Sequence, residues 1–252
     1  MLAIGLAMGV SLREMRLLLN HADCGDLYSK NRRDAIIIFC ITHGYDLLRT
    51  DDELYRFGEK TGIDLPYEAS GLVANRRYKE KNFDDGEWYL SETFDAAIGQ
   101  GFNLVTPLQA AMVMGEIAAD GKRYKPHVVN RIIAPDGSVV KDFQPELLSQ
   151  LDVPEEDIKL VQDGLHDVTK YGTAASSFRG FTVDIAGKTG TAENSQGRDH
   201  GWFVAYGPFD NPNVVVAVIV ENGGYGSQSA VPIGRKILEA AFGLNQDGGD
   251  KK

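Results

Sequence analysis

Seven consecutive apolar residues at 214–220, VVVAVIV, constrain the fold of this chain more than any other segment. A short run of β-branched residues bounded by turn signals is typical of a central strand that is buried on both faces. The turn-forming segment PFDNPN precedes the run, and before that turn GWFVAYG at 201–207 alternates aromatic with small residues. The two segments therefore predict neighbouring strands joined by a turn.

A third strand is predicted at 181–187, FTVDIAG. Apolar and polar residues alternate along it, which places Phe181, Val183 and Ile185 on one face. The three predicted strands are close together in the sequence, so the simplest arrangement is an antiparallel sheet.

Helical segments flank these strands. Residues 106–121 begin with Thr106 as an N-cap and Pro107 at the first helical position, and Gly121 marks the end. A second helix is predicted at 153–172 and a closing helix at 233–243, where Gly243 ends it. The apolar face of the second helix consists of Ile158, Val161, Leu165 and Val168. Together these elements predict an α+β fold, an antiparallel sheet with helices packed on it.

Two other segments complete the prediction for the middle of the chain. RIIAPDGSVVKDF at 131–143 is typical of a hairpin, since two β-branched runs surround a Pro-Asp-Gly turn. NRRYKEKNFDDGEWYLSETFD at 75–95 is polar and aromatic, and it predicts an exposed excursion with solvated charges.

Composition excludes several functional classes. The 252 residues are 43% hydrophobic and 25% charged, which is ordinary for a globular chain, and the formal net charge is −10. An acidic chain without a Lys/Arg run is a poor candidate for binding nucleic acid or an anionic membrane. Two cysteines, Cys24 and Cys40, indicate neither a disulfide framework nor a redox site. The apolar first ten residues are too short to span a bilayer and lack a basic start, so no export signal or anchor is visible.

The stretch DIAGKTGTAE at 184–193 is the main candidate for a functional site. Lys188 comes one residue after the predicted strand, on the face opposite Ile185, so we expect it to point away from the core. Gly187 and Gly190 lack a Cβ, which lets a ligand backbone approach, and a peptide can lie along such an edge as an added strand. A fixed cation, a hydroxyl and backbone N–H groups are what a peptide-processing serine enzyme requires. The tripeptide alone favours a strand-end lysine in solvent with Gly190 at a turn, and the context of the strand is what indicates a site.

Longer stretches around this motif carry a family resemblance. Lys188-Thr189-Gly190 resembles the third motif of the penicillin-recognising serine enzymes, whose set is SxxK, SxN and KTG. Residues 54–243 resemble class B penicillin-binding proteins of the cell-elongation type, with a transpeptidase or β-lactamase-like fold. The segments that carry the resemblance are TGIDLPYEASG (61–71), IGQGFNLVTPLQAAMVMGEIAADGKRYKPHVV (98–129), AGKTGTAE (186–193) and HGWFVAYGPFDNPNVVVAVIVENGG (200–224).

The resemblance implies a peptidoglycan D,D-transpeptidase domain that works without a metal or cofactor. In that family a serine attacks the penultimate D-alanine carbonyl of a stem peptide, an amine resolves the acyl-enzyme, and β-lactams acylate the same serine. Lys188 would help orient protons and the substrate carboxylate, Thr189 would bind that carboxylate, and Gly190 would keep the edge open. The N–H of Thr191 would be half of the oxyanion hole. The implied partners are stem peptides, β-lactams and a glycan-polymerising protein of the elongation machinery, outside the cytoplasm at the plasma membrane, and no nucleic acid.

The expected nucleophile is missing from the sequence. SVVK at 138–141 is its one match to SxxK. The segment follows a Pro-Asp-Gly turn and contains β-branched valines, so it predicts the return arm of a hairpin. Residues three apart on a strand point to opposite faces, which prevents Lys141 from taking a proton from Ser138. It also follows, in chain order, the place where the family carries this motif.

The second motif has two possible positions. SKN at 29–31 fits SxN by its letters. Alternatively DAIIIFCI at 34–41 aligns with the family segment, in which case Phe39 and Ile41 stand where Ser and Asn are expected. The residues leave both alignments open.

These departures divide the chain into three parts. We interpret 1–53 as a degenerate or truncated remnant of the transpeptidase domain, 54–245 as its C-terminal part, and 246–252 as a disordered tail. The fold is thus expected to be N-terminally incomplete and inactive alone. The alternative is a non-catalytic module of this fold that binds stem peptides or a protein partner.

Overall fold

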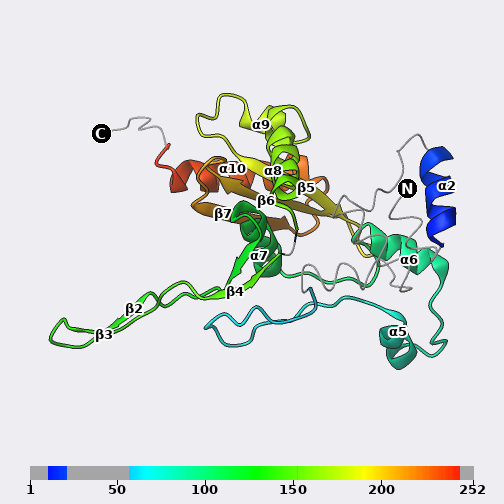
Figure 1. The fold of residues 1–252 in the computed structure, drawn as a ribbon, viewed down its shortest axis with the longest axis horizontal. Coiled ribbons are helices and arrows are strands. Elements are labelled where there is room, and N and C mark those ends of the chain that lie inside the picture. The colour runs from blue at the N-terminus through cyan, green and yellow to red at the C-terminus, as the bar shows by residue number, and fades with distance from the viewer. Residues whose placement is uncertain (1–10, 22–56, 152, 245–252) are drawn as a thin grey trace. The chain divides into compact units, whose positions relative to one another are not determined.

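The computed structural model describes residues 11–21, 57–151 and 153–244 (Figure 1). These residues form two compact units. The first unit comprises Met1–Thr106, Lys125–Glu146 and Leu151–Asp157. The second comprises Pro107–Tyr124, Leu147–Gln150 and Ile158–Lys252, and it holds the candidate site.

A three-stranded antiparallel sheet forms the centre of the second unit (Figure 1). It consists of β5 (Ala186–Ala192), β6 (His200–Gly207) and β7 (Val214–Val220), in that spatial order. The prediction of three neighbouring strands is confirmed, but the choice of 214–220 as the central strand is wrong. Among the described strands β6 is central, because β5 and β7 both pair with it. The apolar run of β7 reflects helices on both of its faces rather than strands on both edges.

Two helices cover opposite faces of this sheet. Alternate residues of β6 point to opposite sides: Phe203 packs with Leu238 of α10 (Gly226–Ala241), whereas Tyr206 packs with Met114 of α7 (Pro107–Ala118). Both aromatic side chains are completely buried. This layering confirms the predicted α+β architecture, an antiparallel sheet with helices packed on it.

The ends of α7 and α10 follow the predicted stop signals closely. Past α7 the backbone N–H of Gly121 donates to Glu116 O over 2.8 Å, and both Asp120 (φ 55°) and Gly121 (φ 82°) have positive φ. Past α10 the left-handed residue is Gly243, and the Leu244 N–H donates to Glu239 O over 2.8 Å, as the Gly121 N–H does to Glu116 O. The predicted start of the last helix at 233 is wrong: α10 begins at Gly226 and carries Pro232 inside it. Proline normally ends a helix, which is why the sequence places the start after it.

The helix α8 (Glu155–Lys170) turns three of the four predicted apolar residues toward the core: Ile158 is buried, and Leu165 and Val168 pack against the core clusters. Val161 is 49% exposed, while Gln162 and Thr169 are buried. Gln162 Nε2 donates to Ile117 O over 2.8 Å and to Asp120 Oδ1 over 3.0 Å. Polar side chains can occupy a buried helix face when each finds a partner, which is why a search for apolar residues alone does not find Gln162 and Thr169. A short helix, α9 (Ala175–Phe178), follows.

The predicted strand at 181–187 is wrong in its bounds, since residues 181–185 are irregular and β5 starts at Ala186. The polar groups here have partners outside a sheet: Phe209 N–H donates to Asp184 O over 2.9 Å, and Ile185 O accepts from Thr169 Oγ1. The alternation itself is real, because Phe181, Val183 and Ile185 pack on the core beneath α10.

A small second sheet lies beside α7 in the same unit. Its strands are β1 (Lys122–Tyr124) and β4 (Leu147–Gln150), paired antiparallel. Arg123 of β1 forms an ion pair of 3.7 Å with Glu116 of α7, and both side chains are buried.

The first unit contains the predicted hairpin, formed by β2 (Arg131–Ile133) and β3 (Val139–Asp142) (Figure 1). Ser138 stands at its turn, where its N–H and Oγ both contact Asp136 Oδ1, at 2.9 Å and 2.6 Å. The segment SVVK is therefore extended, as predicted, and does not form the helical turn that an SxxK motif requires. The unit also contains the helix α2 (Leu12–His21).

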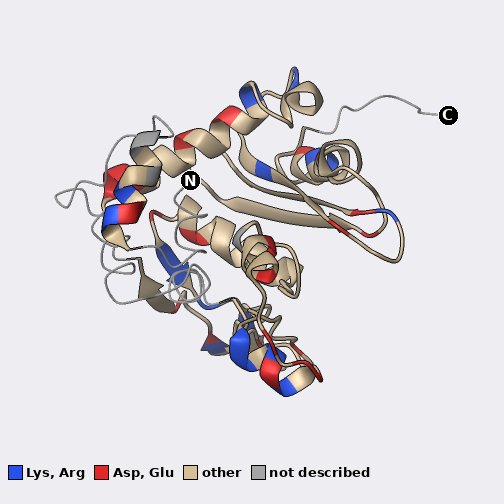
Figure 2. Cartoon of the chain, turned by 90° about the vertical axis from the view of Figure 1, so that its right-hand side faces the viewer, with Lys and Arg blue, Asp and Glu red and all other residues tan. Residues whose placement is uncertain are grey.

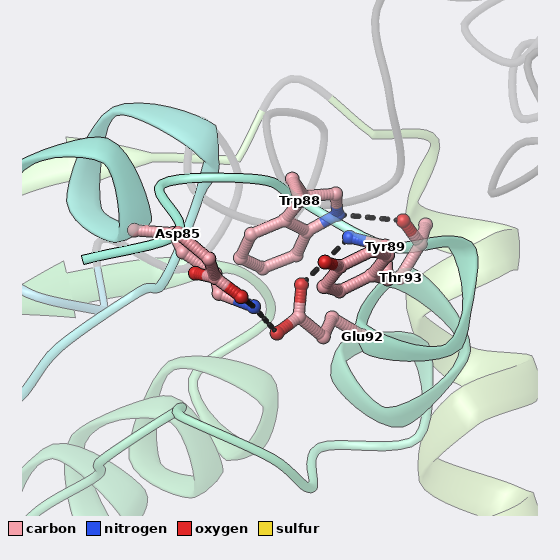
Figure 3. Close-up of polar contacts among 6 residues, drawn as sticks. Asp85, Trp88, Tyr89, Glu92 and Thr93 are labelled. Carbon is pink, nitrogen blue, oxygen red and sulfur yellow. Dashed lines mark hydrogen bonds and ion pairs between the residues drawn. The ribbon is translucent and has the colours of Figure 1, made fainter. Parts of the chain in front are cut away.

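The excursion at 75–95 is only partly exposed. It forms α5 (Arg76–Asn82) and the start of α6 (Leu90–Ala97), and Lys79 is buried between them, contrary to the prediction of solvated charges. Glu92 accepts from Lys79 Nζ with one oxygen and from the Tyr89 backbone N–H with the other, at 2.7 Å (Figure 3). Lys79 Nζ lies 4.6 Å from the Tyr89 ring centre, and Trp88 Nε1 donates to Thr93 over 2.7 Å. Aromatic faces and two carboxylates, those of Glu92 and of Asp85 at 3.8 Å, compensate the buried charge.

Acidic and basic residues alternate along the helices and loops of the described chain instead of forming long tracts of one sign (Figure 2). None of the helices within 11–21, 57–151 and 153–244 combines the length and apolar character needed to cross a bilayer.

Candidate active-site strand

The four predicted site residues lie side by side within β5. Lys188 pairs with Val204, Thr189 with Phe203, Gly190 with Trp202 and Thr191 with Gly201. The motif is thus inside the strand, whereas the sequence places it just after one. Among the described strands β5 is at the edge of the sheet, so its second edge faces no other strand there.

Lys188 is exposed, as predicted. It shares a face of the strand with Ala186, which is buried against Met114 and Tyr206. Its ammonium donates to the backbone O of Thr189 over 2.7 Å. Within the described residues no carboxylate forms an ion pair with Lys188, so its charge is available to an anionic ligand.

The hydroxyl of Thr189 contacts a residue that the sequence analysis did not select. Thr173 Oγ1 lies 2.7 Å from Thr189 Oγ1, and either oxygen can donate. Thr173 is exposed and Thr189 is half-buried, so the two hydroxyls form a pair at the protein surface. The one sequence signal for Thr173 is its place directly after Gly172, where the predicted helix ends.

The end of α8 is fastened to the start of β5 by two further contacts. Thr169 Oγ1 donates to Ile185 O, and Lys170 Nζ donates to Asp184 Oδ1. His166 Nε2 approaches the same carboxylate oxygen at 4.0 Å. The hydrogen bond from Lys170, with its charge and that of His166, holds the pKa of the Asp184 carboxyl below its usual range despite partial burial.

The other end of the motif packs against the start of α10. A Cβ on Gly190 would lie 3.2 Å from Trp202 Cβ, which is tighter than ordinary contact. Thr191 Oγ1 accepts from the Gly226 N–H over 3.5 Å, so this threonine is attached to the first residue of α10. A side chain at position 190 would therefore require Trp202 to shift by a few tenths of an ångström.

A polar clasp connects the β5–β6 turn with the turn after β7. Asn222 donates its backbone N–H to His200 Nδ1 over 2.9 Å, and Asn222 Oδ1 accepts from Asn194 Nδ2 over 2.8 Å. Gly224 N–H donates to Asp199 O over 2.8 Å. Because α10 begins directly after this second turn, the clasp fixes the place where α10 meets β5.

Of the other predicted motif positions, the described residues include only SVVK at 138–141. Ser29–Asn31, Phe39 and Ile41 lie outside the described residues. Ser138 belongs to the first unit. Nowhere in the described ranges do three His, Cys, Asp or Glu side chains gather as metal ligands. As far as the described residues go, the strand thus offers a cation without a carboxylate partner and one hydroxyl pair on an unpaired edge, a combination suited to binding a peptide carboxylate.

A model of the penicillin-binding protein transpeptidase domain matches residues 46–239. The chain belongs to this family. It is of class B and resembles MrdA, the elongation-type peptidoglycan D,D-transpeptidase, so both the predicted family and its subtype are confirmed.

Two known sequences illustrate the relation. The peptidoglycan D,D-transpeptidase MrdA of Haemophilus influenzae is 32% identical over 222 residues, covering 81% of this chain and 33% of the relative. Penicillin-binding protein H of Bacillus subtilis is 35% identical over 192 residues, covering 69% of this chain and 25% of the relative. The chain therefore spans a third or less of the length of these relatives.

Solved structures give the same result for the fold. PBP2 of Pseudomonas aeruginosa, in complex with WCK 5153, superposes with a TM-score of 0.67 at 31% identity, over 85% of this chain and 48% of that one. PBP2 of Helicobacter pylori, in complex with MreC, gives 0.66 at 33% identity, over 79% and 36%. The predicted transpeptidase fold is thus confirmed.

Proposed function

We propose that β5 binds the carboxylate end of a peptidoglycan stem peptide, and that this chain by itself does not carry out the acyl transfer of its family. The observation that supports binding is the arrangement on β5: an exposed Lys188 ammonium next to the Thr189 hydroxyl, on a strand edge open among the described strands. The reason to expect no acylation is that SVVK, the one SxxK match, is extended.

In this proposal the peptide lies along β5 as an added strand. The Thr189 hydroxyl donates to the terminal carboxylate, and the Lys188 ammonium neutralises it and orients nearby protons. The backbone N–H of Thr191 serves as one oxyanion donor, which matters only when a nucleophilic serine attacks the penultimate carbonyl. Such a serine would form an ester with the peptide and release the terminal D-alanine, and an amine would then take the acyl group.

The wider setting follows from the family. We infer that the domain acts outside the cytoplasm at the plasma membrane, on peptidoglycan. Two similar solved structures suggest the kind of partner. One is a PBP2 in complex with MreC, and the other is part of a peptidoglycan synthase complex that coordinates polymerization and crosslinking. A glycan-polymerising protein is accordingly the partner proposed for this chain.

Two measurements test the proposal. Incubation with a fluorescent penicillin, followed by a denaturing gel, should give no covalent band on the unsubstituted chain. A band that disappears in Ser138→Ala would overturn the exclusion of SVVK. Titration with diacetyl-Lys-D-Ala-D-Ala, followed by NMR, should shift the amides of β5, and Lys188→Ala should abolish the shifts. Absence of shifts on β5 would overturn the binding proposal.

A non-catalytic module of the same fold is the alternative function. Such a module would also bind the stem peptide on β5. Unlike a piece of an active transpeptidase, it would not become acylated beside an intact SxxK helix. If the chain binds the peptide yet stays unlabelled when mixed with segments that carry an intact SxxK helix, the non-catalytic module is favoured. Labelling in that mixture would favour a piece of an active transpeptidase.

A further inference from the structure

The hydroxyl of Thr189 can donate only one hydrogen bond. A hydroxyl carries a single proton and can accept two further bonds. Thr189 Oγ1 has a partner in the structure, Thr173 Oγ1 at 2.7 Å. If Thr189 donates to Thr173, no proton remains for a carboxylate; if Thr173 donates, the Thr189 proton is free to point at the ligand.

We propose that Thr173 is a positioning residue, which donates to Thr189 and thereby directs the Thr189 proton toward the terminal carboxylate of the bound peptide. The inference rests on the proposed function of β5 and adds a residue outside the three family motifs. The order of donors is Thr173 to Thr189 to carboxylate. Successive hydroxyls in such a chain polarise one another, so the last bond is strengthened.

The surroundings of Thr173 hold it in place for this role. Thr169, one helical turn before it, donates to Ile185 O, and Lys170 binds the Asp184 carboxylate. After α8 the chain turns sharply at Gly172, where a Cβ would lie 2.8 Å from Val168 Cα. These contacts fix the distance between the helix end and β5 before any ligand arrives.

The residue after Thr173 anchors the turn from the other side. Ala174 is completely buried in the core beneath α10, and its N–H donates to Val168 O over 3.1 Å. Thr173 is therefore an exposed residue between two restrained neighbours, which is the arrangement needed to place one hydroxyl accurately.

The test compares two probes that differ only at the carboxylate: diacetyl-Lys-D-Ala-D-Ala and the same peptide with a C-terminal amide. Their affinities for the full chain are measured from NMR shifts of β5 amides. Thr173→Val, which keeps the shape and removes the hydroxyl, should weaken the carboxylate peptide about fivefold and leave the amide peptide unchanged. Thr173→Ser keeps a hydroxyl and should bind both probes like the unsubstituted chain.

A double substitution separates positioning from direct contact. If Thr173 acts through Thr189, adding Thr173→Val to Thr189→Val should cause no further loss of affinity, because the interaction is already broken. Further loss in the double variant would overturn the inference, since it would mean that Thr173 touches the carboxylate itself. Equal weakening of both probes by Thr173→Val would also overturn it, because that pattern indicates a general structural change.

The outcomes distinguish this inference from the function on which it rests. Normal carboxylate binding by Thr173→Val, with loss in Thr189→Val, overturns the positioning role and leaves the function of β5 intact. No binding by the unsubstituted chain overturns both. If Thr173→Val does not fold, Thr173→Ala provides the same comparison, because the side chain is exposed and alanine adds no atoms.

Discussion

Gly226 lies so close to Gly190 that a Cβ on Gly226 would come within 2.3 Å of the Gly190 carbonyl oxygen. The same Cβ would also lie 2.3 Å from the carbonyl oxygen of Trp202. Both oxygens belong to backbone, which cannot move aside like the end of a flexible side chain. The first residue of α10 therefore has to be glycine for the helix to approach the motif strand this closely.

Gly226→Ala should accordingly destabilise the protein by about 2–3 kcal/mol, since overpacking against backbone forces β5 and α10 apart. Chemical denaturation measures the change in the free energy of unfolding. The matched control is Gly164→Ala in α8, where a Cβ meets nothing within 4 Å. That control should stabilise by about 0.5–1 kcal/mol, because alanine is the better helix former. Equal stability of Gly226→Ala and the unsubstituted chain would contradict the close approach.

Tyr206 offers a change expected to stabilise the protein. Its hydroxyl is buried and has no hydrogen-bond partner among the described residues. An unpaired buried hydroxyl has lost its bonds to water without replacement, so Tyr206→Phe should raise the free energy of unfolding by about 1 kcal/mol. The measurement is denaturant unfolding, with Tyr171→Phe on an 85% exposed tyrosine as the control that should change nothing. A loss of stability in Tyr206→Phe would show that the hydroxyl has a partner, such as an ordered water.

The same residue predicts a pH effect. Burial, followed by the charges of Asp163 and Asp120, raises the pKa of Tyr206 to about 12. The unfolded chain loses this proton near pH 10, whereas the folded chain keeps it. The free energy of unfolding is therefore unaffected by this group below about pH 10 and falls as the pH rises toward about 12. Ultraviolet titration at alkaline pH should show one late phase that is absent in Tyr206→Phe. An identical titration of the two proteins would contradict the prediction.

Lys79 should contribute to the stability of the first unit, because its charged side chain is buried. Lys79→Met removes the ammonium that Glu92 accepts from, and Glu92→Gln removes the countercharge, so each should lower the Tm. Lys81→Met, on an exposed residue of the same helix, is the matched control. A Tm for Lys79→Met equal to that of the control would contradict a role for the buried pair.

The ion pair also sets a pH dependence for the first unit. The hydrogen bond to Glu92, with the charges of Asp85 and Glu92, raises the pKa of Lys79 despite its burial. A raised lysine pKa means that the stabilisation is complete below about pH 10.4 and is lost as the pH rises through the folded-state pKa. Thermal melts across this range should show a steeper decline for the unsubstituted chain than for Lys79→Met. Parallel declines would count against the pair as the cause.

His200 should be protonated on Nε2, because its Nδ1 accepts the Asn222 N–H. Nitrogen NMR of the ring reports this tautomer directly. His200→Asn keeps an acceptor at a similar place, whereas His200→Leu leaves the Asn222 N–H unpaired and should cost about 1 kcal/mol. Faster hydrogen exchange at Asn222 in the leucine variant alone would confirm the contact. Equal exchange in both variants would show that the clasp does not depend on the histidine.

The sequence predicted the elements that depend on local patterns. The hairpin at 131–143 and the α7 helix follow turn and capping chemistry, and both are confirmed. The position of Lys188 at the surface also follows from the alternation around Ile185. Local signals succeed here because each residue's preference agrees with the tertiary structure.

Features that depend on partners distant in the chain could not be predicted. Thr173 reaches Thr189 only after Gly172 turns the chain, and nothing in the letters indicates that two threonines 16 residues apart meet. In the sequence Lys79 resembles any other surface charge, but in the structure the rings of Tyr89, directly before α6, and Phe102, after α6, lie over its ammonium. The rule that proline ends a helix predicts the wrong start for α10, which contains Pro232. Packing of this helix against the sheet outweighs the low helix propensity of one residue.

The strand β5 is held by two different helices: by α8 at its start, where Thr169 Oγ1 donates to Ile185 O, and by α10 near its end, where Gly226 N–H donates to Thr191 Oγ1. A strand held in this way has little conformational freedom left to lose. When a peptide pairs with its edge, the ordering entropy falls almost wholly on the peptide, because the protein side is already arranged as the complex requires. The affinity of a peptide for this edge should then depend on the stiffness of the peptide. Locking the peptide in an extended shape should raise its affinity more than adding polar groups to it.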